Sequence, residues 1–301
     1  SVRLNVNSGW GMMGQFGLSE VRFLYIPAQA REPQPADGAV DVEPAAALSW
    51  RSGREAASHE VYLGTDPAAL ALAGTAASAS FAPALEFGNT YYWQIVEVNE
   101  ADAVPAWAGG VWSFSTKEYE LIDGMETYND DVDAATTIFD TWLDGWVNNT
   151  GSTVGYLNAP FAERTIVRSG AQSMPLEYDN GVAPFYSEAE RQFETAQDWM
   201  RNGADTLVLY VQGDASNSAE AMYVRIEDSS GKSASAVNGD GVITQSLTWQ
   251  EWVIPYSDLS GVNLSRVEKM VIGVGSATAP TAGGTGIVYV DDIGYGRPAA
   301  Q

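Results

Sequence analysis

The chain has 301 residues, of which 39 are acidic and 15 are basic, and it contains no cysteine. Its formal net charge of -24 argues against nucleic acid and anionic lipid as partners, and the missing cysteines exclude disulfides, thiolate zinc sites and cysteine nucleophiles. The longest apolar runs, at 206–211 and 287–290, are far shorter than the ~20 residues of a membrane span, so we expect no membrane insertion.

Strand signals dominate the rest of the pattern. Runs of β-branched and aromatic residues alternate with polar ones and are bounded by Gly, Asn, Asp and Pro clusters, which predicts an all-β protein with short helices only at 66–73 and 188–195. Little lysine beside much Gly, Ser, Thr, Asn and Asp is typical of extracellular bacterial β modules, so a secreted or cell-surface location is expected. Because Ser1 begins directly on a strand-like alternation, we expect a fragment or a processed product.

Residues 1–27 predict two strands, at 2–7 and 18–26, joined by the Gly-rich loop 9–17. The segment SGWGMMGQFGLSEVRFLYIP resembles the last strands of a discoidin-like sugar-binding sandwich, of which this chain lacks the remainder. Two strands alone are only marginally stable. Either they cap the next domain, or their open edges pair with other copies of the chain or with neighbouring domains.

Residues 28–117 begin with the Pro-punctuated linker AREPQPADGAVDVEP and continue with the strand patterns LSW, HEVYLGTD, TYYWQIVEVNE and VWSFST. Their alternating apolar residues supply the two facing layers of a sandwich. This stretch resembles a fibronectin type III-like domain from end to end, most specifically in its YYW and WSFST strands. The resemblance implies a spacer that orients its neighbours and carries no chemistry.

Residues 118–301 open with LIDGMETYND, close with GIVYVDDIGYG, and hold enough alternating strands between them for the two sheets of a jelly roll. The YVRIEDSSG, WVIP and YVDDI segments resemble jelly-roll carbohydrate-binding modules. The whole chain resembles secreted proteins of marine bacteria that combine discoidin-like, fibronectin-like and jelly-roll parts. The predicted fold is therefore a fibronectin-like sandwich followed by a β jelly-roll sandwich, with an N-terminal β-hairpin.

Catalysis by a serine triad is not expected. The only histidine is His59, in a strand of the predicted spacer, and no G-x-S-x-G sequence occurs in the chain. We predict that His59 is a half-exposed strand residue.

A carboxylate pair is the other catalytic possibility, since glycosidases need only two acids roughly 5–10 Å apart. Glu188 and Glu190 lie two residues apart, so on a strand they face the same side, and Glu227 or Asp228 could oppose them. With 39 acidic residues such pairs arise by chance. We therefore predict that the chain is not an enzyme, with a jelly-roll glycoside hydrolase or polysaccharide lyase as the lesser alternative.

Acids at the two ends of residues 118–301 suggest a structural calcium ion. A jelly roll brings its first and last strands side by side, and calcium takes six to eight oxygen ligands. In jelly-roll binding modules such an ion is commonly held at this place, and the resemblance assigns Glu126, Asp291 and the carbonyls of loop 169–173 to it, with Asp130 as a further candidate. The alternative is a pair of solvated acids at a strand end.

Sugar binding needs a flat aromatic platform and planar polar groups. Alternation in AMYVRIED puts Met222, Val224 and Ile226 on a core face and turns Tyr223 and Arg225 to an exposed one, which suits a sugar groove as well as an ordinary solvated face. The turn TWLDGWVNNTG carries two tryptophans that are either packed lids or platforms, and Trp252 is predicted in the core. The ligand-binding candidates are Trp142, Trp146, Tyr186, Tyr223 and Arg225.

The leading hypothesis is a non-catalytic, extracellular, adhesive module that binds a polysaccharide or a cell-surface glycan as part of a larger secreted protein. The alternative is a structural subunit of an extracellular fibre or scaffold that assembles through strand contacts. Cleft depth and the exposure of aromatic rings would separate the first from an enzyme, and repeating contacts through residues 1–27 would favour the second.

Overall fold

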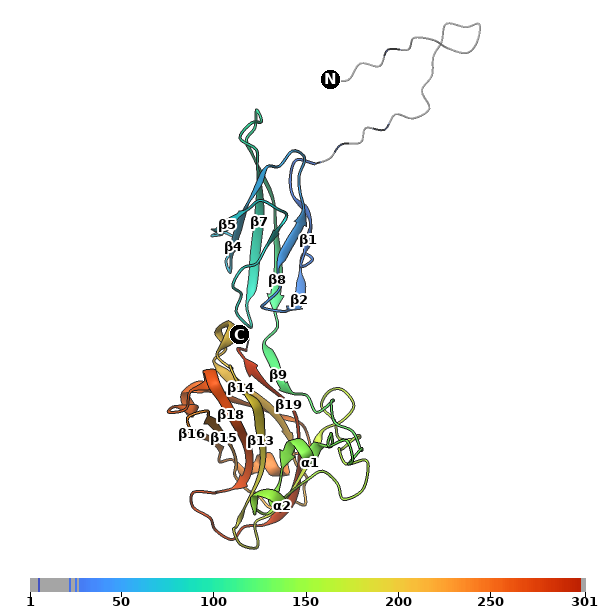
Figure 1. Ribbon diagram of the computed structural model, residues 1–301, viewed down its shortest axis with the longest axis vertical. Coiled ribbons are helices and arrows are strands. Elements are labelled where there is room, and N and C mark those ends of the chain that lie inside the picture. The colour runs from blue at the N-terminus through green and yellow to red at the C-terminus, as the bar shows by residue number, and fades with distance from the viewer. Residues whose placement is uncertain (1–4, 6–21, 23–24, 26, 299–301) are drawn as a thin grey trace, which may run out of the picture.

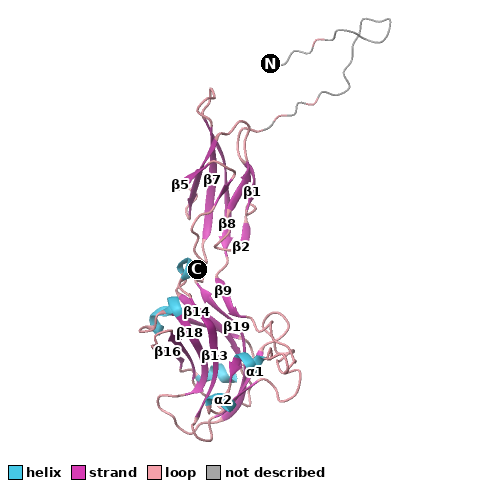
Figure 2. Ribbon diagram, in the orientation of Figure 1, coloured by secondary structure: helices cyan, strands magenta, loops and turns pink. Residues whose placement is uncertain are grey.

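The computed structural model describes Asn5, Arg22, Tyr25 and residues 27–298. The hairpin expected in residues 1–27, and the strand contacts expected through it, lie outside the described residues. The rest of the chain forms two β-sandwiches stacked end to end, an upper one of residues 30–116 and a lower one of residues 119–297 (Figure 1). Strands are the main regular elements of both, as Figure 2 shows, and the all-β prediction is confirmed.

The upper sandwich pairs a three-stranded sheet with a five-stranded one. The first sheet has the order β1 (Arg31–Gln34), β3 (Leu48–Arg51), β6 (Ser80–Phe81). The second has the order β2 (Ala39–Val42), β8 (Ala106–Thr116), β7 (Thr90–Val98), β4 (Ser58–Gly64), β5 (Ala71–Ala76). Strict alternation along β7 buries every second side chain between the two sheets, which is why TYYWQIVEV forms a strand with one core face.

The lower sandwich has two larger sheets. One has the order β10 (Trp142–Leu143), β13 (Tyr186–Gln197), β18 (Val267–Gly275), β15 (Met222–Asp228), β16 (Ser233–Asn238). The other has the order β11 (Ser152–Val154), β12 (Met174–Asp179), β19 (Thr285–Gly296), β14 (Thr206–Gln212), β17 (Gln250–Pro255), with β9 (Tyr119–Asp123) also paired to β19. The first strand therefore lies against the last, as a jelly roll requires.

Short helices close the loops of the lower sandwich. They are α1 (Ile138–Thr141), α2 (Gly145–Asn148) and the 3-10 turns η1 (Arg201–Gly203), η2 (Gly241–Gln245), η3 (Tyr256–Leu259) and η4 (Leu264–Arg266). Both predicted helical windows were wrong: 188–195 lies in β13, where partner strands override local propensity, and 66–73 is a turn leading into β5. Within the described residues, none of the helices has the length and apolar character that crossing a bilayer demands.

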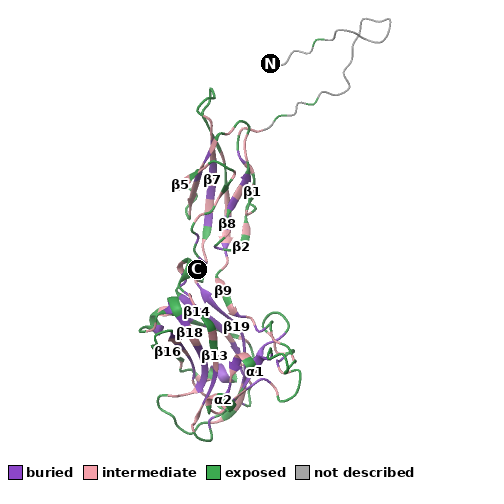
Figure 3. Cartoon of the chain, viewed as in Figure 1, coloured by how far each residue is buried: buried purple, intermediate pink, exposed green. Residues whose placement is uncertain are grey.

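The two sandwiches meet in a contact that we call the seam. Phe87, from the loop before β7, is fully buried in the hydrophobic core of the lower sandwich, and its backbone N–H donates to the carbonyl of Asn202 at 2.9 Å. Arg297 forms ion pairs with Glu86 at 2.8 Å and with Asp205 at 3.1 Å. Figure 3 shows that both sandwiches contain buried strand residues. That independent domains are divided after residues 27 and 117 stays a prediction.

Candidate functional site

The most exposed tryptophan of the described residues stands on α2. Asp144 caps this single helical turn: its carboxylate accepts the N–H of Trp146 at 3.0 Å and the N–H of Val154 at 2.9 Å. The turn ends at Asn149 in the left-handed conformation, with φ of 59°. Gly145 is required at its start, because a Cβ there would lie 2.2 Å from the carbonyl oxygen of Thr150. The result is a rigid turn that leaves Trp146 83% exposed.

A cavity of about 550 Å³ lies beside this ring. Its lining is mostly apolar and aromatic, and comes from α1, α2 and the loops around β11. Three apolar side chains besides Trp146 remain largely exposed around it, namely Val132 at 59%, Val147 at 60% and Leu157 at 83%. Phe139 and Phe161, whose ring centroids are 5.1 Å apart, pack edge to face within the lining. An exposed apolar patch of this kind is a candidate interaction site. We call it the Trp146 site.

Polar groups around the Trp146 site are held in place by the loops themselves. Asp140 accepts the N–H of Thr137 at 3.0 Å, and Tyr156 donates its hydroxyl hydrogen to Glu163. Burial and that hydrogen bond raise the pKa of Tyr156, so its ring keeps a neutral hydroxyl. Burial opposes ionisation of Glu163, but hydrogen bonds from Thr165 and Tyr156 prevail and lower its pKa to about 2.

Trp142, four residues before Trp146, is no platform. It is fully buried, and its indole N–H donates to Asp123 at 2.9 Å, where Arg191 also pairs at 2.5 Å. Strand alternation explains the difference, since β10 turns Trp142 into the core opposite Arg191 and Leu143 away from it. The ligand-binding prediction for Trp142 was therefore wrong.

Tyr223, Arg225 and Tyr186 lie on the outer face of the sheet that carries β13, β18 and β15. The core prediction for the other face of β15 is confirmed, since Met222, Val224 and Ile226 are fully buried. The exposed prediction for Tyr223 was wrong, because the ring is 5% exposed. It lies over Gly273 of the neighbouring strand, where a Cβ would come within 2.1 Å of the ring.

A closed ion-pair network occupies this outer face. Arg225 holds both carboxylate oxygens of Glu188, at 2.5 and 2.9 Å, and Tyr223 donates its hydroxyl hydrogen to the same carboxylate. Glu190 pairs with Lys269 at 3.0 Å. Glu188 and Glu190 thus face the same side, as expected, but each carboxylate is bound to a cation of the sheet. Tyr186, the first residue of β13, lies on the same face and is partly exposed.

The acids assigned to calcium separate into two groups. Glu126 accepts the N–H groups of Ala171 and Gln172, at 2.9 and 3.1 Å. Asp291 accepts the N–H of Arg168 at 2.9 Å, so one loop contacts both carboxylates. Asp130 instead pairs with Arg164 at 2.7 Å and accepts the N–H of Phe161.

Residues 27–298 contain no cluster of three or more histidine and acidic side chains that could hold a metal ion. Asp130 is thus not a third ligand beside Glu126 and Asp291, because its partners belong to another loop. Asp291 is fully buried, none of the described basic side chains forms an ion pair with it, and burial raises its pKa to about 6. Its two oxygens accept the backbone N–H groups of Arg168, Ser169 and Asp292, at 2.9, 3.4 and 2.9 Å.

His59 is buried rather than half-exposed. It is 3% exposed, its Nδ1 bonds to the carboxylate of Glu97, and Glu97 also accepts the N–H of Gly53 at 2.8 Å. The expected half-exposed histidine was wrong, because β4 and β7 pair directly at these two residues and turn both inward.

Sequence reasoning found Trp146 but missed its surroundings. Leu157 and Val132 lie in loops whose Gly, Asn, Asp and Pro content predicts only turns. The available signal was the presence of an apolar residue in each of these polar loops.

No protein-family model matches the chain, and no curated protein matches it. Among solved structures, a carbohydrate-binding module from the β-sandwich superfamily is 12% identical with a TM-score of 0.37, covering 89% of this chain and 97% of its own. The family 11 carbohydrate-binding module from Clostridium thermocellum, in complex with a β-1,3-1,4-mixed-linked tetrasaccharide, is 13% identical with a TM-score of 0.36, covering 62% of this chain and 100% of its own.

An exo-β-agarase is also similar, at 11% identity and a TM-score of 0.41. The match covers 62% of this chain and only 25% of the agarase. The neighbours thus include both binding modules and enzymes. At TM-scores below 0.5 these likenesses establish no shared function.

Proposed function

We propose that this chain is a glycan-binding module and that the Trp146 site is where the glycan binds. The observation that carries the proposal is the 83% exposure of the Trp146 ring on a turn fixed by its Asp144 cap. Exposing a tryptophan is unfavourable unless a ligand covers it, since burial of an aromatic ring removes a large apolar area from water. A sugar ring has an apolar face of C–H groups that stacks on such a platform.

The cavity beside Trp146 supports the same proposal. At about 550 Å³ it falls within the range of roughly 300–1,000 Å³ typical of small-ligand pockets. Tyr156 and Thr153 contribute hydroxyl groups to the lining. Asp140 and Asp144 add negative charge, as does the chain's net charge of -24, so the glycan should be neutral.

We further propose that the module is non-catalytic, secreted and extracellular. Glu188 and Glu190 are the acids nominated for hydrolysis; Glu188 has both oxygens bound by Arg225, and Glu190 is paired with Lys269. Neither carboxylate is arranged as an available acid or nucleophile across a cleft.

A structural calcium ion belongs to this proposal. Glu126 and Asp291, whose carboxylates accept backbone N–H groups of loop 168–172, would hold it, and it would neutralise the buried Asp291.

A glycan array probed with the whole chain tests the function. We expect binding to neutral glycans that is lost in Trp146→Ala and retained in Trp107→Ala, the matched control on β8, where Trp107 is 39% exposed. Absence of binding to every glycan would refute the proposal. Self-association that disappears in Trp146→Ala would instead support the fibre or scaffold alternative.

A further inference from the structure

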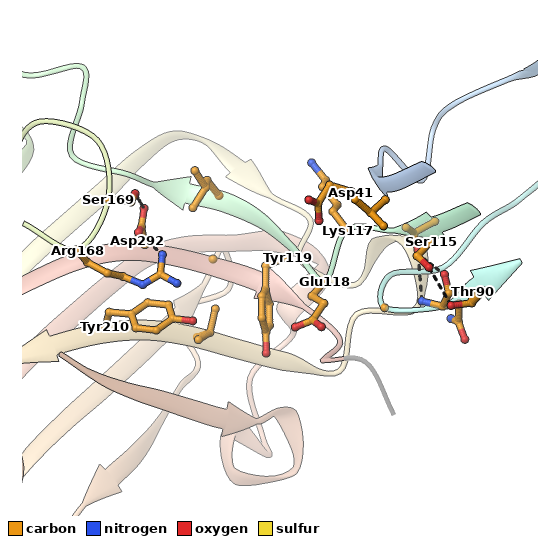
Figure 4. Close-up of a pocket in the computed structure, with 17 residues that line it drawn as sticks. Asp41, Thr90, Ser115, Lys117, Glu118, Tyr119, Arg168, Ser169, Tyr210 and Asp292 are labelled. Carbon is orange, nitrogen blue, oxygen red and sulfur yellow. Dashed lines mark hydrogen bonds and ion pairs between the residues drawn. The ribbon is translucent and has the colours of Figure 1, made fainter. Parts of the chain in front are cut away.

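A second cavity lies in the seam, between the two sandwiches. Its volume is about 550 Å³. The upper sandwich contributes β2, β7 and β8, the lower one contributes β9, β14, β19 and a loop, and the linker at Lys117 and Glu118 crosses it (Figure 4). Neither sandwich alone encloses this space.

The lower wall carries a planar platform. The guanidinium carbon of Arg168 lies 3.5 Å from the centroid of the Tyr210 ring, and Arg168 also pairs with Asp292 at 2.5 Å. Ser169 donates to the same carboxylate at 3.0 Å, and the Tyr210 hydroxyl donates to Glu251 at 2.7 Å. Both planar groups are therefore held in one orientation before any ligand arrives.

The upper wall carries hydroxyls. Thr90 and Ser115, on β7 and β8, form a cross-strand hydrogen bond of 2.9 Å, and each keeps further donor or acceptor capacity. Figure 4 shows this pair at the opposite end of the cavity from Arg168 and Tyr210, with Glu118 and Tyr119 between. An occupant that touches both ends is elongated.

Charge selects against an anion. The cavity carries the carboxylates of Asp41, Glu118 and Asp292. Its two basic groups are already paired, Arg168 with Asp292 and Lys117 with Glu43 and Glu120. An anionic occupant would meet the carboxylates of Asp41 and Glu118, while both basic side chains of the lining are already paired.

We propose that the seam cavity is a second saccharide-binding position, which takes a neutral oligosaccharide and contacts it from both sandwiches at once. The proposal rests on the proposed function, since it assigns the same ligand class to a second place. The stacked Arg168–Tyr210 pair and hydrogen bonds from Thr90 and Ser115 supply the contacts. The Phe87 and Arg297 contacts of the seam keep the two walls in register.

Isothermal titration calorimetry on the full chain tests this, with cellotetraose, xylotetraose, mannotetraose and agarotetraose as neutral probes and tetragalacturonate as the anionic control. We expect two positions in the wild type and one in Trp146→Ala. Adding Thr90→Val and Ser115→Ala, or Tyr210→Ala, should weaken the remaining one at least tenfold. Thr75→Val, on an exposed position of β5, is the matched control and should leave both positions unchanged. Melting curves confirm that each variant folds.

The outcomes separate the two proposals. Complete loss of binding in Trp146→Ala, or residual binding unaffected by the seam substitutions, overturns the seam position and leaves the proposed function intact. Binding that survives Trp146→Ala and is lost only with the seam substitutions supports the seam and overturns the Trp146 site. Absence of binding to all four neutral probes overturns both, and equal binding of tetragalacturonate overturns the neutral selectivity.

Discussion

The ring of Phe87, from the upper sandwich, packs edge-on against Tyr295 of the lower sandwich, with 6.1 Å between their centroids. Tyr295 in turn stacks on Trp199 at 6.4 Å. The core of one sandwich thus includes a residue contributed by the other. The seam is a packed contact, and not merely a place where two modules follow each other along the chain.

Replacing Phe87 with Ala should lower the stability of the lower sandwich by about 3–5 kcal/mol, the usual cost of emptying a fully buried phenylalanine site. Thermal unfolding followed by tryptophan fluorescence measures this. Leu72→Ala, on an edge strand at 53% exposure, should change stability little. An equal effect of both changes would show that Phe87 contributes nothing specific to the seam.

The two tryptophans of the α2 turn should respond oppositely to removal. Trp146→Ala should shift the free energy of unfolding by no more than about 0.5 kcal/mol, because the ring is already in water. Trp142→Ala should cost about 3–5 kcal/mol or abolish folding, since it empties the core and leaves Asp123 one donor short. Urea titrations of the two variants check this, and destabilisation by Trp146→Ala would place that ring in the core.

Breaking the Glu188–Arg225 pair should cost more than its position on an outer face suggests. Glu188 is only 4% exposed, so Arg225→Ala leaves a buried carboxylate with Tyr223 as its remaining side-chain partner, at a cost of about 3 kcal/mol. The double change Glu188→Ala with Arg225→Ala should be less destabilising than the sum of the single ones. Additive effects in this double-mutant cycle would contradict a coupled pair.

Glu163 should make stability depend on acidity. Its pKa is lowered from 4.5 to about 2 in the folded chain, so its contribution is fully present above pH 4.5 and is lost as the pH falls toward 2. The lost stability should be on the order of 1–3 kcal/mol. Melting temperatures between pH 6 and pH 3 should fall more steeply for the wild type than for Glu163→Gln. If the melting temperatures of the two proteins fall in parallel, Glu163 does not contribute to the pH dependence of stability.

Calcium should raise the melting temperature and a chelator should lower it, because the proposed ion would bind the folded state alone. Asp291→Ala should remove most of that dependence. Glu177→Ala, an exposed acid on β12, is a suitable control, whereas Glu97 is not, because it is buried against His59. A melting temperature that does not change when a chelator is added would refute the calcium site.

Periodicity predicted the parts of the structure that depend on neighbours within one strand. Alternation placed Met222, Val224 and Ile226 in the core, and it put Trp252 there as well. Alternation failed for Tyr223, because the space for that ring comes from Gly273 on another strand. The pairing register of two strands cannot be read from the alternation within one of them. The seam could not be predicted for the same reason, because the sequence around Phe87 does not indicate that its ring packs in the neighbouring sandwich.

One pair in the sheet register has a mechanical consequence. Tyr119, where the chain enters the lower sandwich, lies directly opposite Gly296, where it leaves. Tension applied between the upper sandwich and Arg297 would therefore load this end of the β9–β19 pair together with the Phe87 and Arg297 contacts of the seam, and would open the hydrogen bonds of the pair one after another. The turn that carries Trp146 lies at the far end of the lower sandwich, where α2 is labelled in Figure 1, outside the path of that load.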